Sequence, residues 1–142
     1  CWTPFQWNFF VSCYNHTNKL TERINFSRNS LNSKELKITS RLLFYKADIR
    51  NVTLTVGDAS QGWPLVERVD TIVITAACAQ VLDDYLQSLK VGGKLLIVTG
   101  TAPAMSVQLI TRVSEREWQP QFLFETVIPY MIHGEPSQQF EF

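Results

Sequence analysis

Three apolar runs decide the fold: Asn51-Val-Thr-Leu-Thr-Val-Gly-Asp-Ala59, Val69-Asp-Thr-Ile-Val-Ile-Thr-Ala-Ala77 and Lys90-Val-Gly-Gly-Lys-Leu-Leu-Ile-Val-Thr-Gly100. Each run is short and rich in β-branched residues, and a helix-like span separates the second from the third. This alternation is typical of consecutive parallel strands in an α/β sheet. Gly57 and Asp58 stand at the carboxyl end of the first run, where open α/β sheets hold their ligands.

The bulk composition indicates one soluble domain. A chain of 142 residues with 45% hydrophobic and 18% charged residues has the size and composition of a single globular core. No run reaches the roughly 18 apolar residues of a membrane-spanning helix. The three cysteines, Cys1, Cys13 and Cys78, form no CxxC pair and no cluster with histidine. This scatter argues against a disulfide framework or a metal site and favours a reduced, cytoplasmic setting.

Charge is distributed unevenly along the chain. Residues 1–50 contain eight Lys/Arg against three Asp/Glu, a balance of +5, and residues 51–142 contain five against ten, a balance of −5. A basic, aromatic-rich front is compatible with nucleic-acid binding. A solvated basic face that neutralises an acidic body explains the same numbers, and we favour this second interpretation. We therefore expect neither a nucleic-acid nor a membrane partner.

The periodicity of the apolar residues predicts the order of the elements. Residues 1–30 show no clean period and are expected to form a divergent or poorly ordered front of a single domain, 1–142. Two helices are predicted from their apolar stripes, the first with a capping residue, Ser33, and the second with a stop signal, Val91-Gly92-Gly93. The last two strands alternate as an antiparallel pair does. The predicted elements are helix 33–46, strand 52–56, strand 71–75, helix 79–90, strand 94–99, strand 106–113 and strand 122–130.

Several segments together resemble one known family over about two-thirds of the chain, from Asn51 to Phe142. They are Arg50-Asn-Val-Thr-Leu-x-x-Gly-Asp-Ala-Ser-x-Gly-Trp63, Val69-Asp-Thr-Ile-x-Ile-Thr-Ala-Ala77, Leu89-Lys-Val-Gly-Gly-Lys-Leu95, Leu109-Ile-Thr-Arg112, Leu123-Phe-Glu-Thr-Val-Ile-Pro129 and His133-x-Glu-Pro136. In this order and spacing they resemble the protein-L-isoaspartate O-methyltransferase family, and especially its bacterial paralogues with a His-x-Glu-Pro tail.

The resemblance implies a fold and an activity. The fold would be an incomplete Rossmann-like class I methyltransferase sheet with C-terminal antiparallel strands. The activity would be transfer of a methyl group from S-adenosylmethionine to the α-carboxyl of isoaspartyl residues in damaged proteins. A carboxylate acceptor is already ionised at neutral pH, so the reaction needs alignment more than an acid–base pair. No catalytic residue is predicted.

The resemblance also implies the site residues. Gly57, Asp58 and Ala59 would hold the adenine, since an acidic side chain accepts a hydrogen bond from the exocyclic amine. Glu22 would bind the ribose hydroxyls. The next strand would flank the methionine part of the cofactor, and a later segment would line the substrate groove. The residues concerned are Thr75 and Ala76 for the methionine part, and Ile128, Pro129 and Tyr130 for the groove.

Five residues also have simpler interpretations. Asp58 could be only a turn residue after Gly57. We expect Asp70 to begin a strand, His133 to be a satisfied surface histidine, and Trp63 to belong to the core. Cys78 is most simply a small buried hydrophobe.

The front of the chain departs from the family. A glycine-rich turn lets backbone N–H groups approach the cofactor, and counting back from Glu22 places that turn at residues 1–5. Those residues are Cys1-Trp-Thr-Pro-Phe5, and all six glycines lie at Gly57 or later. Bulky side chains and Pro4 do not allow the same approach, so we expect impaired cofactor binding.

Two questions stay open at the level of sequence. The front could reflect a truncated gene fragment, a front translated out of frame, or a degenerate paralogue. The function could be that of a methyltransferase, or that of a non-catalytic α/β module that binds another protein. A methyltransferase with an RNA or small-molecule acceptor is a third option, against which the C-terminal segments speak.

Overall fold

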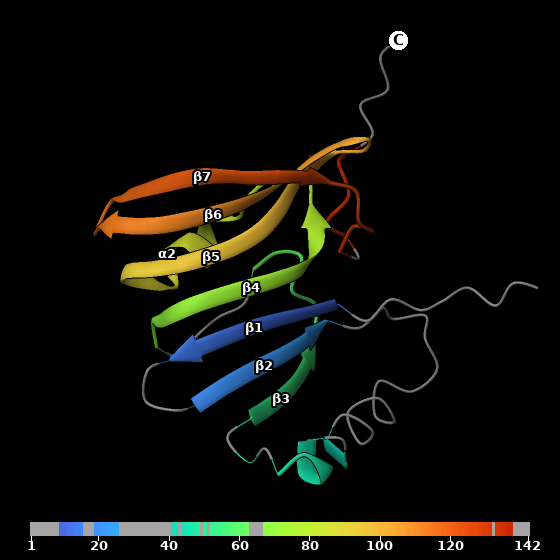
Figure 1. The fold of residues 1–142 in the computed structure, drawn as a ribbon, viewed down its shortest axis with the longest axis vertical. Coiled ribbons are helices and arrows are strands. Elements are labelled where there is room, and N and C mark those ends of the chain that lie inside the picture. Colours follow the sequence, from blue (N-terminus) through green and yellow to red (C-terminus); the bar gives the residue numbers. More distant parts are fainter. Residues whose placement is uncertain are drawn as a thin grey trace, which may run out of the picture.

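A single mixed sheet organises the computed structural model, which describes residues 9–15, 19–25, 41–42, 44–48, 50, 52–62, 67–131 and 133–137. Within these residues the sheet has seven strands in the order β3-β2-β1-β4-β5-β6-β7 (Figure 1). The strands are β1 Phe9–Asn15, β2 Lys19–Asn25, β3 Val52–Gly57, β4 Val69–Cys78, β5 Leu89–Thr101, β6 Ala104–Ser114 and β7 Glu117–Thr126.

The strand directions define the functional edge of the sheet. β3 is parallel to β2 and β5 is parallel to β4, whereas β1 is antiparallel to both of its neighbours, β2 and β4. Strands β2, β3, β4 and β5 therefore all point the same way, and their carboxyl ends share one edge. This arrangement agrees with the incomplete Rossmann-like α/β fold that the sequence predicts.

One expectation about the strands is wrong. The three runs do not form three neighbouring strands, because β2 and β1 lie between β3 and β4. The physical reason is the short connection between β1 and β2, which comprises only residues 16–18. A parallel connection needs a crossover of a dozen or more residues. The two strands therefore pair as a hairpin, with Asn15 opposite Lys19, and enter the sheet together.

The second predicted helix is much shorter than expected. Helix α2 covers only Asp83–Gln87, and its N-cap Leu82 has an extended backbone with no side-chain cap. The predicted end of the helix joins β5 instead, because Leu89 pairs with Val69 of β4 and is fully buried there. The apolar stripe is confirmed nonetheless. Tyr85 is buried, and Val81, Leu82 and Leu86 pack against the core.

The first predicted helix lies mostly outside the described residues. Its last part is confirmed, since residues 41–42 and 44–46 are helical. Residues 33–40, residues 1–8 and Trp63 lie outside the described part of the chain.

The C-terminal antiparallel pair is confirmed, with different bounds. β6 pairs with β7, and the turn between them comprises Glu115 and Arg116 alone. The predicted longer turn is wrong because Trp118 already pairs with Arg112. The guanidinium of Arg112, which is 1% exposed, lies 5.2 Å from the ring centre of Trp118. It also donates to the backbone oxygens of Gln87 and Leu89, so it joins the hairpin to α2 and β5.

Burial is concentrated on the face of the sheet that α2 covers (Figure 1). The larger core cluster joins alternate side chains of β4 and β5, among them Ile72, Ile74, Leu95 and Ile97, to Tyr85. The apolar run 71–75 predicts a strand buried on both faces, and this is wrong, since Val73 is half-buried and Thr75 is exposed. In the described part of the chain, no helix is long and apolar enough to cross a membrane.

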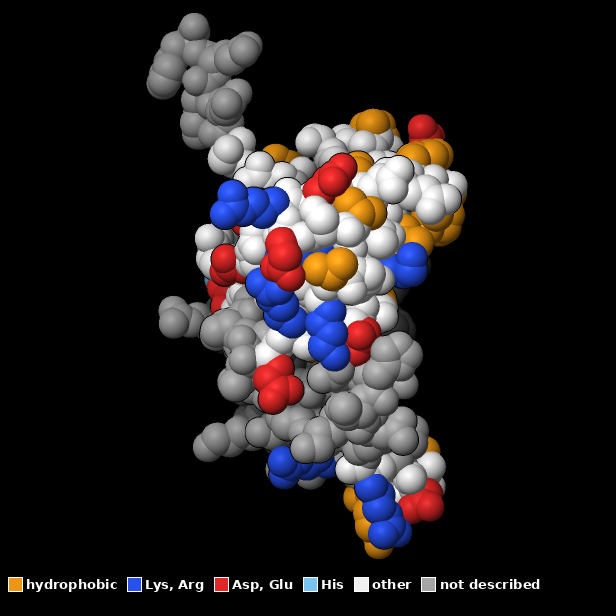
Figure 2. Space-filling view, turned by 90° about the vertical axis from the view of Figure 1, so that its left-hand side faces the viewer, with side chains coloured by type: hydrophobic (Ala, Val, Ile, Leu, Met, Phe, Trp, Pro, Cys, Tyr) orange, Lys and Arg blue, Asp and Glu red, His pale blue; other side chains and the backbone are white. Residues whose placement is uncertain are grey.

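Charged side chains of both signs are interspersed at the end of the sheet where β4 and β5 begin. Figure 2 shows blue and red groups side by side there. Arg68 pairs with Glu115 at 3.0 Å, and Lys90 pairs with Asp70 at 3.1 Å. Asp70 is the second residue of β4, as expected of a residue that begins a strand.

Candidate binding site at the carboxyl ends of β3 and β4

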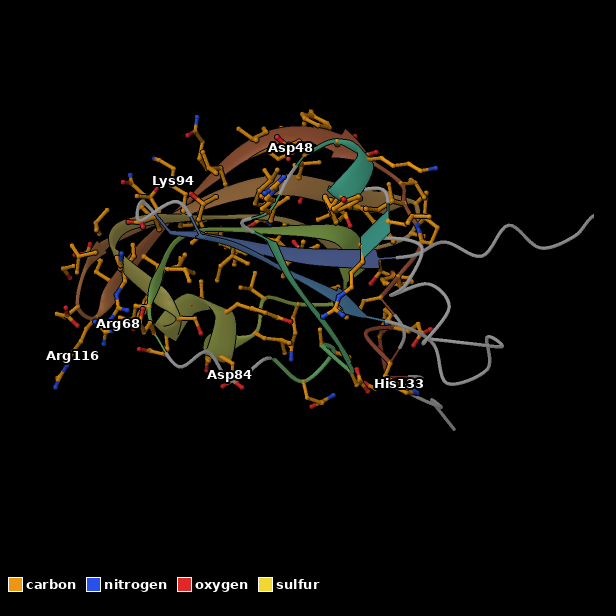
Figure 3. The ribbon with its side chains drawn as sticks, turned by 90° about the horizontal axis from the view of Figure 1, so that it is seen from below. Asp48, Arg68, Asp84, Lys94, Arg116 and His133 are labelled. Atoms are coloured by element: carbon orange, nitrogen blue, oxygen red, sulfur yellow. The ribbon has the colours of Figure 1, made fainter. Side chains whose placement is uncertain are left out.

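The Asp58 carboxylate is held at both oxygens, immediately after β3. Its Oδ1 accepts a hydrogen bond from the backbone N–H of Ser60 at 2.9 Å. Its Oδ2 lies 2.8 Å from Nδ1 of His133, a residue 75 positions later in the chain. Half of the Asp58 side-chain surface is exposed. Figure 3 shows His133 at one end of the sheet, opposite the end that carries Arg68 and Arg116.

Asp58 is ionised at neutral pH. Its partial burial raises the pKa, but the hydrogen bond from the Ser60 backbone and the contact with His133 lower it by more. The net effect holds the pKa of Asp58 below its usual value. The side chain therefore acts as a hydrogen-bond acceptor only.

Helix α2 positions the turn that follows Asp58. The Tyr85 hydroxyl donates to the buried carbonyl oxygen of Ala59 at 2.7 Å, and the N–H of Gly62 donates to that same oxygen at 3.2 Å. Gly62 has a φ of +95°, and a Cβ added there would collide with the Asp84 side chain. Only glycine suits a position with this backbone angle and this neighbour.

The segment after β7 packs along the end of β4. The N–H of Ala77 donates to the Pro129 oxygen at 3.0 Å, and the N–H of Met131 donates to the Ala77 oxygen at 2.7 Å. The N–H of Ala79 then donates to the Gly134 oxygen at 3.0 Å. These three bonds place His133 beside Asp58. His133 itself has a φ of 63°, a left-handed conformation in which histidine is enriched.

A cleft of about 400 Å³ opens beside this pair. Its walls come from the turn after β3, the end of β4, the end of β5 and the C-terminal segment. Burial raises the pKa of the Cys78 thiol to about 11, so Cys78 stays protonated and is a poor nucleophile. The lining residues are Ser60, Gln61, Cys78, Ala79, Gln80, Leu82, Thr101, His133, Gly134, Glu135, Pro136 and Ser137.

Among the described residues, an unpaired hydroxyl and the absence of a metal-binding cluster bear on the kind of ligand that the cleft suits. The hydroxyl oxygen of Ser60 is buried and has no hydrogen-bond partner among the described residues. The part of the chain that the structure describes contains no cluster of three or more His, Cys, Asp or Glu residues able to hold a metal ion.

The structure brings together some of the predicted site residues. Gly57 ends β3 and Asp58 follows it, while Ala59 is buried behind the turn. The segment from Ile128 to Tyr130 lies beside Ala77, with Tyr130 bridged to it. The Tyr130 hydroxyl donates to the Gly100 oxygen at 3.0 Å and accepts from the Ala102 N–H at 3.2 Å.

Other predicted site residues lie away from this cleft. Thr75 is exposed and Ala76 is fully buried, and neither lines the cleft. Glu22 lies in the middle of β2, opposite Leu54, whereas Asn25 of the same strand stands opposite Gly57. The backbone of Glu22 therefore lies three residues before the edge of the sheet where Asp58 stands.

Sequence reasoning missed two contacts of this site. His133 lies at the surface, as expected, and its Nδ1 contacts Asp58, a partner that could not be read from the sequence. The family resemblance of the His-x-Glu-Pro tail was the only sequence signal that pointed to a role for His133. The hydrogen bond of the Tyr85 hydroxyl was also missed. The apolar stripe of the helix explains why the Tyr85 ring is buried, but gives no hint of a partner for its hydroxyl.

Comparison with known proteins places these features in a family. The family model described as protein-L-isoaspartate(D-aspartate) O-methyltransferase matches residues 28–128. A protein-L-isoaspartate O-methyltransferase of Shewanella sp. (strain ANA-3) is 37% identical over 83 residues, which cover 58% of this chain and 39% of the relative. A protein-L-isoaspartate O-methyltransferase of Staphylothermus marinus is 39% identical over 70 residues, which cover 49% of this chain and 31% of the relative. The matches thus span about two fifths or less of these relatives.

Two solved structures share the fold. One is a putative protein-L-isoaspartate O-methyltransferase from Plasmodium falciparum in complex with S-adenosyl-L-homocysteine. It has a TM-score of 0.58 and 17% identity, and the match covers 69% of this chain and 48% of that one. The other, a protein-L-isoaspartate O-methyltransferase, has a TM-score of 0.59 and 19% identity, over 69% and 31% of the two chains.

Proposed function

Because this chain belongs to the protein-L-isoaspartate O-methyltransferase family, we propose that it acts in S-adenosylmethionine-dependent methylation of isoaspartyl carboxylates, with weakened cofactor binding. One observation carries the proposal. The Gly57-Asp58 pair of the first family segment stands at the carboxyl edge of the sheet, with an ionised and half-exposed carboxylate next to a cleft. Open α/β sheets bind their ligands at this edge.

The residues present fit one end of the cofactor. An ionised carboxylate and a cleft lined by hydroxyl, amide and imidazole groups suit the amine and the hydroxyls of an adenosine. When bound, the cofactor would supply the methyl group as part of a sulfonium. The segment 128–130, fixed through the Tyr130 hydroxyl, would line the groove for the acceptor peptide.

The described part of the chain offers little support to the other end of the cofactor. β1 runs antiparallel to β4, with Tyr14 opposite Thr71. The carboxyl end of β1 therefore lies at the edge opposite to Asp58, where it cannot bring backbone N–H groups to a ligand beside Asp58. This direction of β1, together with the absence of glycine from residues 1–56, supports the proposed weakening.

Titration of the full chain with S-adenosylhomocysteine tests the proposal. We expect saturable binding with a Kd weaker than about 100 μM, which is less than about 5.5 kcal/mol of binding free energy. Transfer of labelled methyl groups to an isoaspartyl peptide should be slow but above that of an aspartyl control peptide. A Kd of a few micromolar would overturn the impairment. No saturable binding and no transfer would overturn the methyltransferase function.

A non-catalytic protein-binding module is the second candidate. The exposed apolar side chains of β7, with Phe122 59% and Phe124 57% exposed, favour it because such side chains gather at interaction surfaces. The same transfer assay separates the two candidates, since a binding module produces no labelled peptide.

A further inference from the structure

The His133 imidazole contacts the Asp58 carboxylate and also lines the cleft. Its Nδ1 touches Asp58 Oδ2 at 2.8 Å. His133 lines the cleft, whereas Asp58 does not. A ligand in the cleft can therefore contact the imidazole directly.

The contact with Asp58 fixes the tautomer of His133. An ionised carboxylate can only accept, so the short contact requires that Nδ1 carries the proton and donates. In a neutral imidazole the other nitrogen, Nε2, is then an acceptor. Among the described residues, Nε2 has no hydrogen-bond partner.

Both members of the pair are held in place by the backbone. The Ser60 N–H fixes Asp58 through Oδ1 at 2.9 Å. On the other side, the Gly134 N–H donates to the Met131 oxygen at 2.7 Å, and the Gly134 oxygen accepts from Ala79 at 3.0 Å. The main chain on the C-terminal side of His133 is thus anchored to the end of β4.

We propose that His133, oriented by Asp58, is the residue that selects the base of the nucleoside ligand. Its Nε2 accepts a hydrogen bond from the exocyclic amine of an adenine, and offers no donor to the oxo group of a hypoxanthine. The inference rests on the proposed function, and assigns the base-reading contact to a histidine of the C-terminal segment instead of to Asp58 itself.

Comparing two ligands tests this assignment. S-adenosylhomocysteine presents a 6-amino group, and its inosine analogue presents a 6-oxo group. The wild-type chain should bind the adenine compound about three- to tenfold more tightly, the worth of one neutral hydrogen bond. His133→Ala should reduce this preference to less than twofold.

Asp58→Asn should reverse the preference. The carbonyl of the introduced side-chain amide would keep the hydrogen bond from the Ser60 N–H, which leaves the NH₂ group of that amide facing Nδ1 of His133. Nδ1 must then accept, so that Nε2 carries the proton and becomes a donor. A donor suits the 6-oxo group of the inosine analogue. Arg116→Ala, at the opposite end of the sheet (Figure 3), is the control and should keep the wild-type preference.

Nitrogen NMR of the free chain provides a second, ligand-independent readout. We expect His133 to show the Nδ1–H tautomer in the wild type and the Nε2–H tautomer in Asp58→Asn. An Nε2–H tautomer in the wild-type chain overturns the inference, whichever of the two compounds the chain binds more tightly. Equal affinity for both compounds overturns the inference alone. Absence of saturable binding for both overturns it together with the proposed function.

Discussion

At the scale of single residues, the site depends on contacts between side chains and the backbone of one turn. Asp58 accepts from the Ser60 N–H, and the Ala59 carbonyl accepts from the Tyr85 hydroxyl. The Asp58–Ser60 bond holds the turn from within, and the Tyr85–Ala59 bond ties it to α2. Without the Tyr85 hydroxyl, the buried Ala59 carbonyl would keep only the longer bond from the Gly62 N–H, at 3.2 Å, and its lost donor would not be replaced by bulk water.

Removal of the Tyr85 hydroxyl should therefore destabilise the chain measurably. We expect Tyr85→Phe to lower the free energy of unfolding by about 1–2 kcal/mol, measured by urea denaturation. Tyr45→Phe is the matched control because Tyr45 is 75% exposed, and it should change the stability by less than about 0.5 kcal/mol. Equal effects of the two substitutions would show that the Ala59 bond contributes nothing.

At the scale of elements, Arg112 connects three parts of the chain. From β6 its guanidinium reaches the oxygens of Gln87 and Leu89, where α2 ends and β5 begins. It also reaches the oxygens of Ser114, at the end of β6, and Glu115, in the β6–β7 turn. The rigid fork of an arginine suits this divergent set of acceptors, whereas the single ammonium group of a lysine does not.

Arg112→Met should leave several backbone oxygens without a donor. We expect a loss of about 3 kcal/mol or more in the free energy of unfolding, because one buried and three part-buried hydrogen bonds are lost together. Arg112→Lys should retain less than half of the stability that Arg112→Met loses. Arg68→Met is the control. It removes the half-exposed partner of Glu115 and should cost no more than about 1 kcal/mol. Similar losses for Arg68→Met and Arg112→Met would contradict the role of Arg112.

At the scale of the whole molecule, the direction of β1 separates this chain from a complete parallel sheet. The hairpin of β1 and β2 keeps β2 parallel to β3 and leaves β1 reversed between β2 and β4. The edge that carries Asp58 therefore receives the ends of β2, β3, β4 and β5, but not that of β1. At the far side of the sheet, β7 is an edge strand with exposed side chains from Gln119 to Glu125.

Exposed phenylalanines on an edge strand promote self-association. The double substitution Phe122→Lys and Phe124→Lys should raise the concentration at which light scattering appears. The free energy of unfolding should change by less than about 1 kcal/mol, since both side chains are already more than half exposed. Val91→Lys, which replaces an exposed side chain on β5, should leave the scattering threshold unchanged. An equal effect of Val91→Lys would assign self-association to general hydrophobicity and not to β7.

The sequence by itself determined the elements whose signals are local. The β-branched runs gave β3, β4 and β5, and the alternation after Ser106 gave the antiparallel pair of β6 and β7. The stripe around Tyr85 gave the buried face of α2. Gly57-Asp58 was placed at the carboxyl end of its strand for the same reason, since a turn residue after an apolar run marks a strand end.

Only the tertiary structure decided which strands are neighbours and which partner Asp58 has. The position of β3 depends on a hairpin formed by residues with no readable periodicity, and the length of α2 depends on the pairing of Leu89 with Val69. The contact of Asp58 with His133 spans 75 residues. No local pattern encodes it, because it follows from the way the segment after β7 packs against Ala77 and Ala79.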